Sequence, residues 1–385
     1  MTLSIENARI LRVDGVIERG DLAVEDGVIA DVGSARPSAR RIDGSGLLLL
    51  PGIVDLHGDA FERQIMPRPG VRVPLEIALA DTDRQMIANG ITTAYHGVTC
   101  SWEPGLRGLQ ACRDFLAALA RIGSRLACDT RMHLRFETYN LDAIEEARGW
   151  IGAGLIGILA FNDHAPGIHA GRKDMMKASK ILERTGLSHE KFIELVEQVL
   201  DRSGQVDGAM KSLAAAAQAQ NVPLMSHDDE DGDMRHYYAE LGCAIAEFPK
   251  SMGAAETARD MGHAIVMGAP NVMRGGSHNG AICATTLVEA GLCRVLASDY
   301  YYPSQLVAAF RLADKGVADF ADCWRLVSAN PARAVGLADR GEIAVGQRAD
   351  LVLIDDRNGS DPRVIATIAG GVVRYMADCT LLQAA

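Results

Sequence analysis

The sequence predicts an α/β fold: a (β/α)₈ barrel of the TIM type, with a small β-sandwich formed from both chain ends. Eight apolar strand candidates alternate with helical patterns through the middle of the chain, which indicates parallel pairing. Both ends consist of short apolar segments separated by Asp-Gly or Gly-Gly turns. The 385 residues suit a barrel of about 250–300 residues with a small second domain. We expect sandwich segments at residues 1–50 and 336–385 and the barrel at 51–335.

Turn signals at the two ends delimit the strands of the predicted sandwich. Asp14-Gly15 and Asp26-Gly27 each lie between apolar segments, as in β-hairpins. The expected strands are Leu3–Ile5, Ile10–Val13, Leu22–Val24, Val28–Val32, Gly341–Ile343, Ala349–Ile354, Val364–Ala369 and Val372–Tyr375.

The middle of the chain supplies eight barrel strands: Ile53–Leu56, Thr92–Tyr95, Thr130–Phe136, Leu155–Phe161, Pro223–Ser226, Ala244–Phe248, Ala264–Met267 and Arg294–Ser298. Helical patterns lie between them at Leu75–Asn89, Leu106–Ile122, Glu190–Leu200, Val206–Gln220, Ala254–Met261 and Ile282–Ala290. A doubly wound sheet is the alternative, but no G-x-G-x-x-G turn follows the first strand. The connection from about 162 to 205 is much longer than the others, which is typical of a functional or mobile segment.

Composition narrows the classes of partner. The net charge of −11 argues against a nucleic-acid or anionic-membrane surface. No apolar run approaches the ~18 residues of a membrane span, and the first residues lack the features of a signal peptide. Eight cysteines without a C-x-x-C pair suggest reduced, mostly buried thiols. We therefore expect a cytoplasmic protein, and a homo-oligomer is compatible with these data. The acidic net charge does not exclude a small anionic substrate, because a few arginines and a metal ion can reverse the sign of the charge inside a pocket.

Polar residues at the carboxyl ends of barrel strands point into the active-site mouth, so these positions are the first candidates for chemistry. After the first strand, His57 and Asp59 face the same way and can bind one metal ion together. On the third strand Arg135 and Glu137 share a face with His133. Glu137 can bridge two ions, or it can form an internal salt bridge with Arg135.

The remaining strands complete a ring of candidate metal ligands. His227 ends the fifth strand and is a good neutral nitrogen ligand. His164 after the fourth strand and Glu247 on the sixth are weaker candidates. Asp299 ends the eighth strand beside the first, where it can bind metal and accept a proton from an attacking water; a helix N-cap is the alternative role. This set suits one or two divalent ions, zinc first and manganese or iron as alternatives.

Several motifs together resemble the amidohydrolase superfamily. They are Pro51-Gly52-Ile53-Val54-Asp55-Leu56-His57, then Asn330-Pro331-Ala332, and Gly341-Glu342-Ile343-Ala344-Val345-Gly346 with Ala349-Asp350-Leu351-Val352. The resemblance covers nearly the whole chain. It implies a (β/α)₈ barrel, a β-sandwich from both termini, and one or two metal ions.

Finer motifs resemble the branch of that superfamily that acts in phosphonate metabolism. They include Met66-Pro67-Arg68-Pro69-Gly70, His133-Leu134-Arg135-Phe136-Glu137, Asp163-His164-Ala165-Pro166-Gly167, Glu247-Phe248-Pro249 and Arg274-Gly275-Gly276-Ser277-His278. This resemblance implies hydrolysis of α-D-ribose 1-methylphosphonate 5-triphosphate to the 5-phosphate and pyrophosphate. Just after His57 the chain departs from the branch pattern, with Gly58, Ala60 and Phe61.

Basic residues near the predicted mouth suit a polyphosphate, because guanidinium groups bind phosphate oxygens in pairs. The expected substrate-binding residues are Arg63, Arg68, Arg135, Arg274 and His278. Two alternatives stay open. One is an amidase, lactonase or deaminase of the same fold, acting on a small compound that can itself be phosphorylated; the other is a non-catalytic assembly protein.

Overall fold

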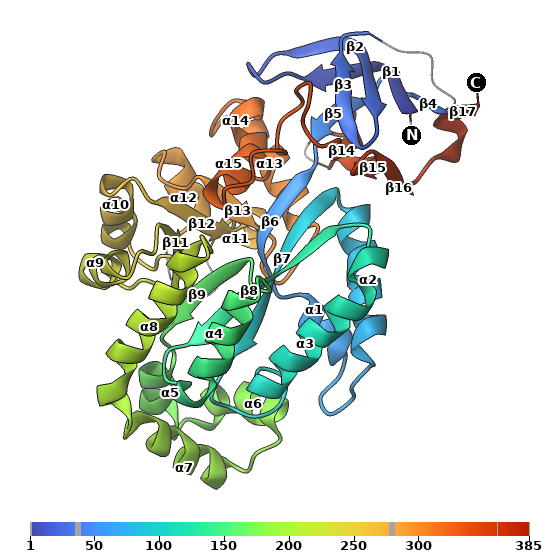
Figure 1. Ribbon diagram of the computed structural model, residues 1–385. Helices are drawn as coiled ribbons and strands as arrows, with labels where there is room; N and C mark the ends of the chain where they lie inside the picture. The colour runs from blue at the N-terminus through green and yellow to red at the C-terminus, as the bar shows by residue number, and fades with distance from the viewer. Residues whose placement is uncertain (1, 35–39, 277–281, 360, 385) are drawn as a thin grey trace.

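The computed structural model describes residues 2–34, 40–276, 282–359 and 361–384. Its larger part is an eight-stranded parallel sheet in which each strand pairs with the next along the chain (Figure 1). The strands are β6 (Ile53–Gly58), β7 (Ile91–Cys100), β8 (Asp129–Glu137), β9 (Ile158–Asn162), β10 (Leu224–His227), β11 (Ile245–Glu247), β12 (Ala264–Gly268) and β13 (Val295–Ala297). The predicted (β/α)₈ barrel and all eight of its expected strands are confirmed.

Most of the helices cover the outside of this sheet, as the apolar periodicity predicts, while those between residues 165 and 200 lie at one end of the barrel. In chain order they are α1 (Phe61–Ile65), α2 (Leu75–Ala88), α3 (Leu109–Ile122), α4 (Ile144–Gly152), α5 (Ala165–Gly171), α6 (Met175–Thr185), α7 (His189–Leu200), α8 (Val206–Ala219), α9 (Gly232–Glu240), α10 (Met252–Asp260), α11 (Ala269–Arg274), α12 (Ala284–Glu289), α13 (Ser304–Asp314), α14 (Phe320–Arg325) and α15 (Ala329–Ala334). Side-chain caps fix several starts: Ser188, Asp231 and Ser251 each accept a backbone N–H of the first turn.

The first and last strands meet mainly at their carboxyl ends. There the Asp299 N–H donates to the carbonyl of His57 at 2.8 Å, and the Asp59 N–H donates to the carbonyl of Asp299 at 2.9 Å. Nearer the amino ends, Leu326 and Val327 lie between the two strands and accept their backbone N–H groups. The seam of the barrel is therefore closed by the same backbone segments that carry the predicted metal ligands.

Some predicted boundaries were wrong. The fourth strand begins at Ile158 rather than Leu155, because the chain turns at Gly154 (φ +70°) and leaves Leu155 exposed. The helix expected from Leu106 begins at Leu109, after the Gly108 N-cap. The long 162–205 connection contains three helices, α5 to α7, with a small apolar core of their own that includes Ala178, Ile181, Phe192 and Val196.

A second, nine-stranded sheet combines both ends of the chain, as predicted, and lies at one end of the barrel (Figure 1). Its strands are β1 (Thr2–Leu11), β2 (Ile17–Glu25), β3 (Val28–Val32), β4 (Arg40–Asp43), β5 (Leu48–Pro51), β14 (Leu351–Asp355), β15 (Arg363–Ala369), β16 (Val372–Met376) and β17 (Leu382–Ala384). The two strands expected at Leu3–Ile5 and Ile10–Val13 are one strand, whose register shifts between Ile5 and Ala8. Gly341–Ile343 is not a strand, since Gly341 (φ +94°) packs against the backbone of Ser328 and Ala329.

Apolar side chains from the strands fill the interior of the barrel, including Val54, Tyr95, Ile158, Met225 and Val266. All eight cysteines are unpaired; six are buried, Cys283 is half-buried and Cys379 is exposed. Within the described ranges, no helix is both long and apolar enough to cross a membrane.

Candidate metal centre

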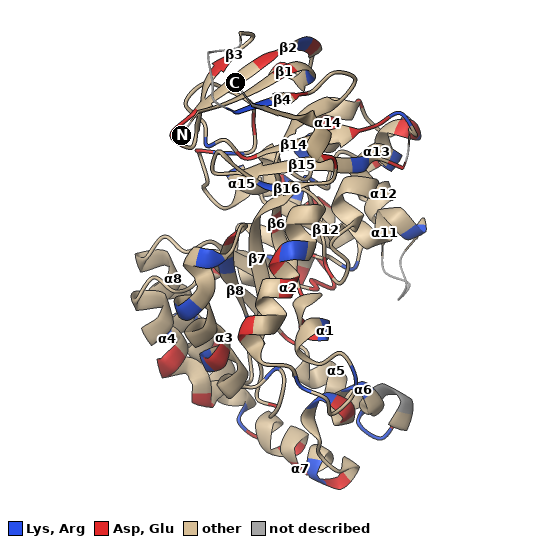
Figure 2. Cartoon of the chain, turned by 90° about the vertical axis from the view of Figure 1, so that its right-hand side faces the viewer, with Lys and Arg blue, Asp and Glu red and all other residues tan. Residues whose placement is uncertain are grey.

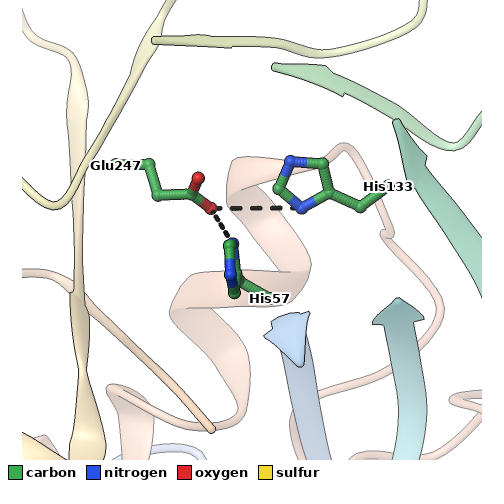
Figure 3. A group of neighbouring side chains, drawn as sticks. All are labelled: His57, His133 and Glu247. Carbon is green, nitrogen blue, oxygen red and sulfur yellow. Dashed lines mark hydrogen bonds and ion pairs between the residues drawn. The ribbon is translucent and has the colours of Figure 1, made fainter. Parts of the chain in front are cut away.

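The carboxylate of Glu247 connects two histidines at the mouth of the barrel. Its Oε1 lies 2.8 Å from Nδ1 of His57, and its Oε2 lies 2.7 Å from Nδ1 of His227. His133 approaches the same carboxylate, with Nδ1 at 4.0 Å from Oε1 (Figure 3). An ionised carboxylate only accepts hydrogen bonds, so Nδ1 of His57 and of His227 carries the proton. This leaves Nε2 of His57 for a metal ion or substrate, whereas Nε2 of His227 accepts a hydrogen bond from Arg135, which a metal ion there would displace.

Charge and burial set the protonation of this group. Burial by itself raises the pKa of Glu247, but the neighbouring His57 and His133 outweigh it and hold the pKa well below the usual range for a carboxyl. Burial lowers the pKa of His133 to about 3 and also lowers that of His227. Glu247 is therefore ionised, while His133 and His227 are neutral imidazoles, the form that binds metal ions.

A second carboxylate–histidine pair lies beside the first group. Glu137 Oε1 accepts from Nδ1 of His164 at 2.6 Å, and His164 Nε2 lies 3.8 Å from the carboxylate of Asp228. Burial lowers the pKa of His164, but the charge of Glu137 outweighs it and raises the pKa to about 9. Glu137 thus orients His164 through its side chain, a contact that sequence alone could not reveal.

The third group contains His57, Asp59 and Asp299, whose ligand atoms all lie within 4.8 Å of one another. The backbone of Asp299 is left-handed (φ +56°), a conformation that non-glycine residues adopt mainly at functional sites and turns. Burial raises the pKa of Asp299 to about 6. The two backbone hydrogen bonds across the barrel seam hold this carboxylate beside His57.

The residues present fit a bound divalent ion. The Nε2 atom of His133 is buried and has no hydrogen-bond partner among the described residues. Three groups of side chains bring ligand atoms within 4.8 Å of each other: His57, His133 and Glu247; His164, His227 and Asp228; and His57, Asp59 and Asp299. Mixed nitrogen and oxygen donors of this kind suit zinc, manganese or iron.

A cavity of about 190 Å³ opens onto these groups. Arg135 of β8, Lys250 of the loop after β11 and Arg274 at the end of α11 all line it. The Arg135 guanidinium also approaches the Asp59 carboxylate at 3.4 Å and donates to Nε2 of His227 at 3.1 Å. Basic side chains therefore face the same space as the candidate ligands.

The other predicted substrate residues have different positions. Arg63 lies 5.8 Å above the ring of Tyr300, which lines the cavity, whereas Arg68 is exposed on the loop after α1. His278 lies outside the described residues. The sequence analysis named neither Lys250 nor Asp228 as a site residue. Their closeness in sequence to Glu247 and His227 was the available signal.

The family model described as "Amidohydrolase family" matches residues 75–375. The chain belongs to the amidohydrolase family. It is 34% identical over 362 residues to an alpha-D-ribose 1-methylphosphonate 5-triphosphate diphosphatase of Escherichia coli K12. The alignment covers 91% of this chain and 94% of that protein. It is 26% identical over 364 residues to an adenine deaminase of Nitratidesulfovibrio vulgaris, covering 93% of this chain and 55% of that protein.

Solved structures of amidohydrolases share the fold. An amidohydrolase from a Sargasso Sea sample has a TM-score of 0.66 at 14% identity, covering 98% of this chain and 93% of that chain. A prolidase complexed with N-methylphosphonate-L-proline has a TM-score of 0.62 at 16% identity, covering 98% and 100%. Membership of the family makes the chain a hydrolase, and its members generally bind divalent metals, for which the barrel mouth carries candidate ligands.

Proposed function

We propose that this amidohydrolase cleaves the α–β phosphoanhydride of α-D-ribose 1-methylphosphonate 5-triphosphate and releases the 5-phosphate and pyrophosphate. The observation that carries the proposal is the 34% identity to the Escherichia coli diphosphatase across almost the full length of both chains. The cavity chemistry supports it. An overall acidic protein gathers Arg135, Lys250 and Arg274 around the candidate metal ligands.

We assign one or two divalent ions to ligand atoms from the three groups of candidate ligands, among them His57, Asp59, His133, His164, His227 and Asp299, with zinc as the first candidate and manganese or iron as alternatives. Glu137, expected from the sequence as a bridging ligand, is given a different role in this proposal. A bound divalent ion supplies a Lewis acid for a phosphoryl oxygen and makes water more acidic. Glu247 and Glu137 hold histidines in position through Nδ1, an outer role that increases the basicity of the ring.

In this proposal, different residues of the cavity accept the proton, bind the phosphates and exclude water. Asp299, with its pKa raised by burial, accepts the proton of the attacking water at its carboxylate and can return it to the products. Arg135, Lys250 and Arg274 bind phosphate oxygens and stabilise the charge on departing pyrophosphate. Phe248 and Met267 line the same cavity and exclude bulk water.

The second candidate is deamination or amide hydrolysis, which the weaker likeness to adenine deaminase suggests. The two can be separated by product. Purified full-length chain loaded with zinc or manganese is incubated with the ribosyl triphosphate, and pyrophosphate release is followed; adenine is incubated in parallel, and ammonia release is followed. Pyrophosphate from the first and no ammonia from the second is the expected result. Ammonia without pyrophosphate would replace the proposal by the deaminase.

A further inference from the structure

A second cavity of about 560 Å³ lies beside the metal-centre cavity. Its roof comes from the α5–α7 segment and its floor from the loops after β7, β9, β10 and β11. Lys250 lines both cavities, and His164 lines this one while facing Asp228 in the other. The two spaces are therefore neighbours that share a wall next to the candidate metal ligands.

Size is the first reason to give this cavity a role. Pockets that bury small ligands measure about 300–1,000 Å³, and the metal-centre cavity is below that range at about 190 Å³. A volume of this size suits the reacting phosphates better than the whole substrate. The second cavity has enough space for the rest of such a substrate.

Charge is the second reason. Arg107, Arg172, Lys180, Arg184 and Lys250 line the cavity, against the two carboxylates of Asp163 and Glu230. Three of these cations are already paired: Arg107 with Glu62, Arg184 with Glu103, and Lys250 with Asp228 and Glu230. Arg172 contacts a half-exposed Glu197, and Lys180 has no ion pair with any described residue. Lys and Arg positions, coloured blue, lie along the α5–α7 segment (Figure 2).

The apolar residues that line the second cavity indicate which part of the substrate it fits. Ile168, Ile181, Phe192 and Met234 lie among the cations, a mixture that suits a sugar ring and a methyl group carried next to an anion better than a bare polyphosphate. The segment is also firmly held. Arg184 donates two hydrogen bonds to Glu103, at 2.6 and 2.9 Å, and Gly105 packs directly on the Arg184 carbonyl.

We propose that the cavity under α5–α7 binds the non-reacting sugar-phosphonate end of the substrate, with Lys180 and Arg172 facing its anion. This assignment rests on the proposed function, because it gives a binding place to the sugar-phosphonate end of that substrate, whose phosphates lie in the metal-centre cavity. The α5–α7 segment then selects the substrate, while the strand ends carry the reaction.

Two substitutions test the cavity without touching the metal centre. Gly167 lines it and has open space where a side chain would start, so Gly167→Leu fills the cavity, and Lys180→Gln removes a charge. Matched controls are Gly208→Leu on α8, also in open space, and Lys191→Gln on α7; neither residue lines the cavity. Titration calorimetry on the metal-loaded full chain measures binding of α-D-ribose 1-methylphosphonate 5-phosphate and, separately, of inorganic pyrophosphate.

Both cavity variants should bind the sugar phosphonate about tenfold or more weakly, with pyrophosphate affinity unchanged and both controls like wild type. Unchanged affinity for the sugar phosphonate in both variants overturns the inference, as does wild-type protein that does not bind it. A loss confined to pyrophosphate also overturns it, because the cavity then holds the leaving group. Pyrophosphate release by wild-type enzyme is measured in parallel. Wild-type protein that binds the sugar phosphonate but releases no pyrophosphate contradicts the proposed function and not the binding role of the cavity.

Discussion

The imidazole rings of His57 and His227 lie almost parallel, 11° apart in plane and 6.0 Å between centroids, because each gives Nδ1 to a different oxygen of Glu247. One carboxylate thus sets the orientation of ligands from two strands that are not neighbours in the barrel.

Replacing Glu247 with Gln should disturb both histidines. The amide has only one oxygen to accept a hydrogen bond, so one ring loses its fixed orientation. We expect metal affinity or turnover to fall by about 10–100-fold, measured as metal per chain after dialysis and as kcat. The control is Glu240→Gln on the exposed side of α9. Full metal content and wild-type kcat in Glu247→Gln would contradict this role.

His57→Ala and Asp59→Ala should each remove metal and activity but leave a folded barrel. Both side chains end β6 at the candidate centre, and the apolar interior of the barrel does not depend on them. Elemental analysis reports the metal, and circular dichroism reports the fold. Full metal occupancy in both variants would refute the assignment.

Asp299→Asn should lower kcat more than it weakens substrate binding. The amide keeps the size of the side chain but cannot accept the proton, which matters in the transition state. A loss of about 10²-fold or more in kcat is expected. If kcat is unchanged and only KM rises, Asp299 positions the substrate and does not accept the proton.

Arg274→Gln should raise KM for the triphosphate substrate, since Arg274 lines the metal-centre cavity. Rising salt should raise the KM of the wild-type enzyme more than the KM of the variant, because screening reduces the capture of a highly charged ligand. Steady-state kinetics at several salt concentrations provides the comparison. Equal salt dependence in both proteins would mean that Arg274 does not face the substrate.

His96 predicts a specific loss of stability in acid. Its ring packs against Phe61 and Phe115, and burial lowers its pKa to about 4 from an ordinary value of 6.5. Between pH 6.5 and pH 4, His96 is protonated in the unfolded chain but stays neutral in the folded protein. The free energy of unfolding therefore falls between pH 6.5 and 4, by about 3 kcal/mol for this residue, and no further below pH 4.

His96→Leu removes this titration. Its denaturant midpoint should change less between pH 7 and pH 4.5 than that of the wild type, as followed by urea unfolding at each pH. Parallel pH dependence in the two proteins would show that His96 is not the group responsible.

The strands and most helices could be predicted because apolar periodicity is a local property of the chain. The ring of polar residues at strand ends followed from the barrel geometry. The pairing of Glu247 with His57 and His227 could not be predicted, since it depends on side-chain directions across strands that are far apart in sequence. For the same reason the exposed position of Arg68 outside the cavity lining and the place of Lys250 within that lining appear only in three dimensions.

The way the barrel closes also bears on how the protein is made. The seam joins Asp55 to Ser298, 243 positions apart, through two hydrogen bonds, and Asp299 reaches His57 only across that seam. A chain still emerging from the ribosome carries His57 and Asp59 long before Asp299 has been synthesised. The third group of candidate ligands is therefore incomplete until nearly four-fifths of the polypeptide exists. With the metal assignment proposed above, we expect full metal loading only at the end of synthesis and folding.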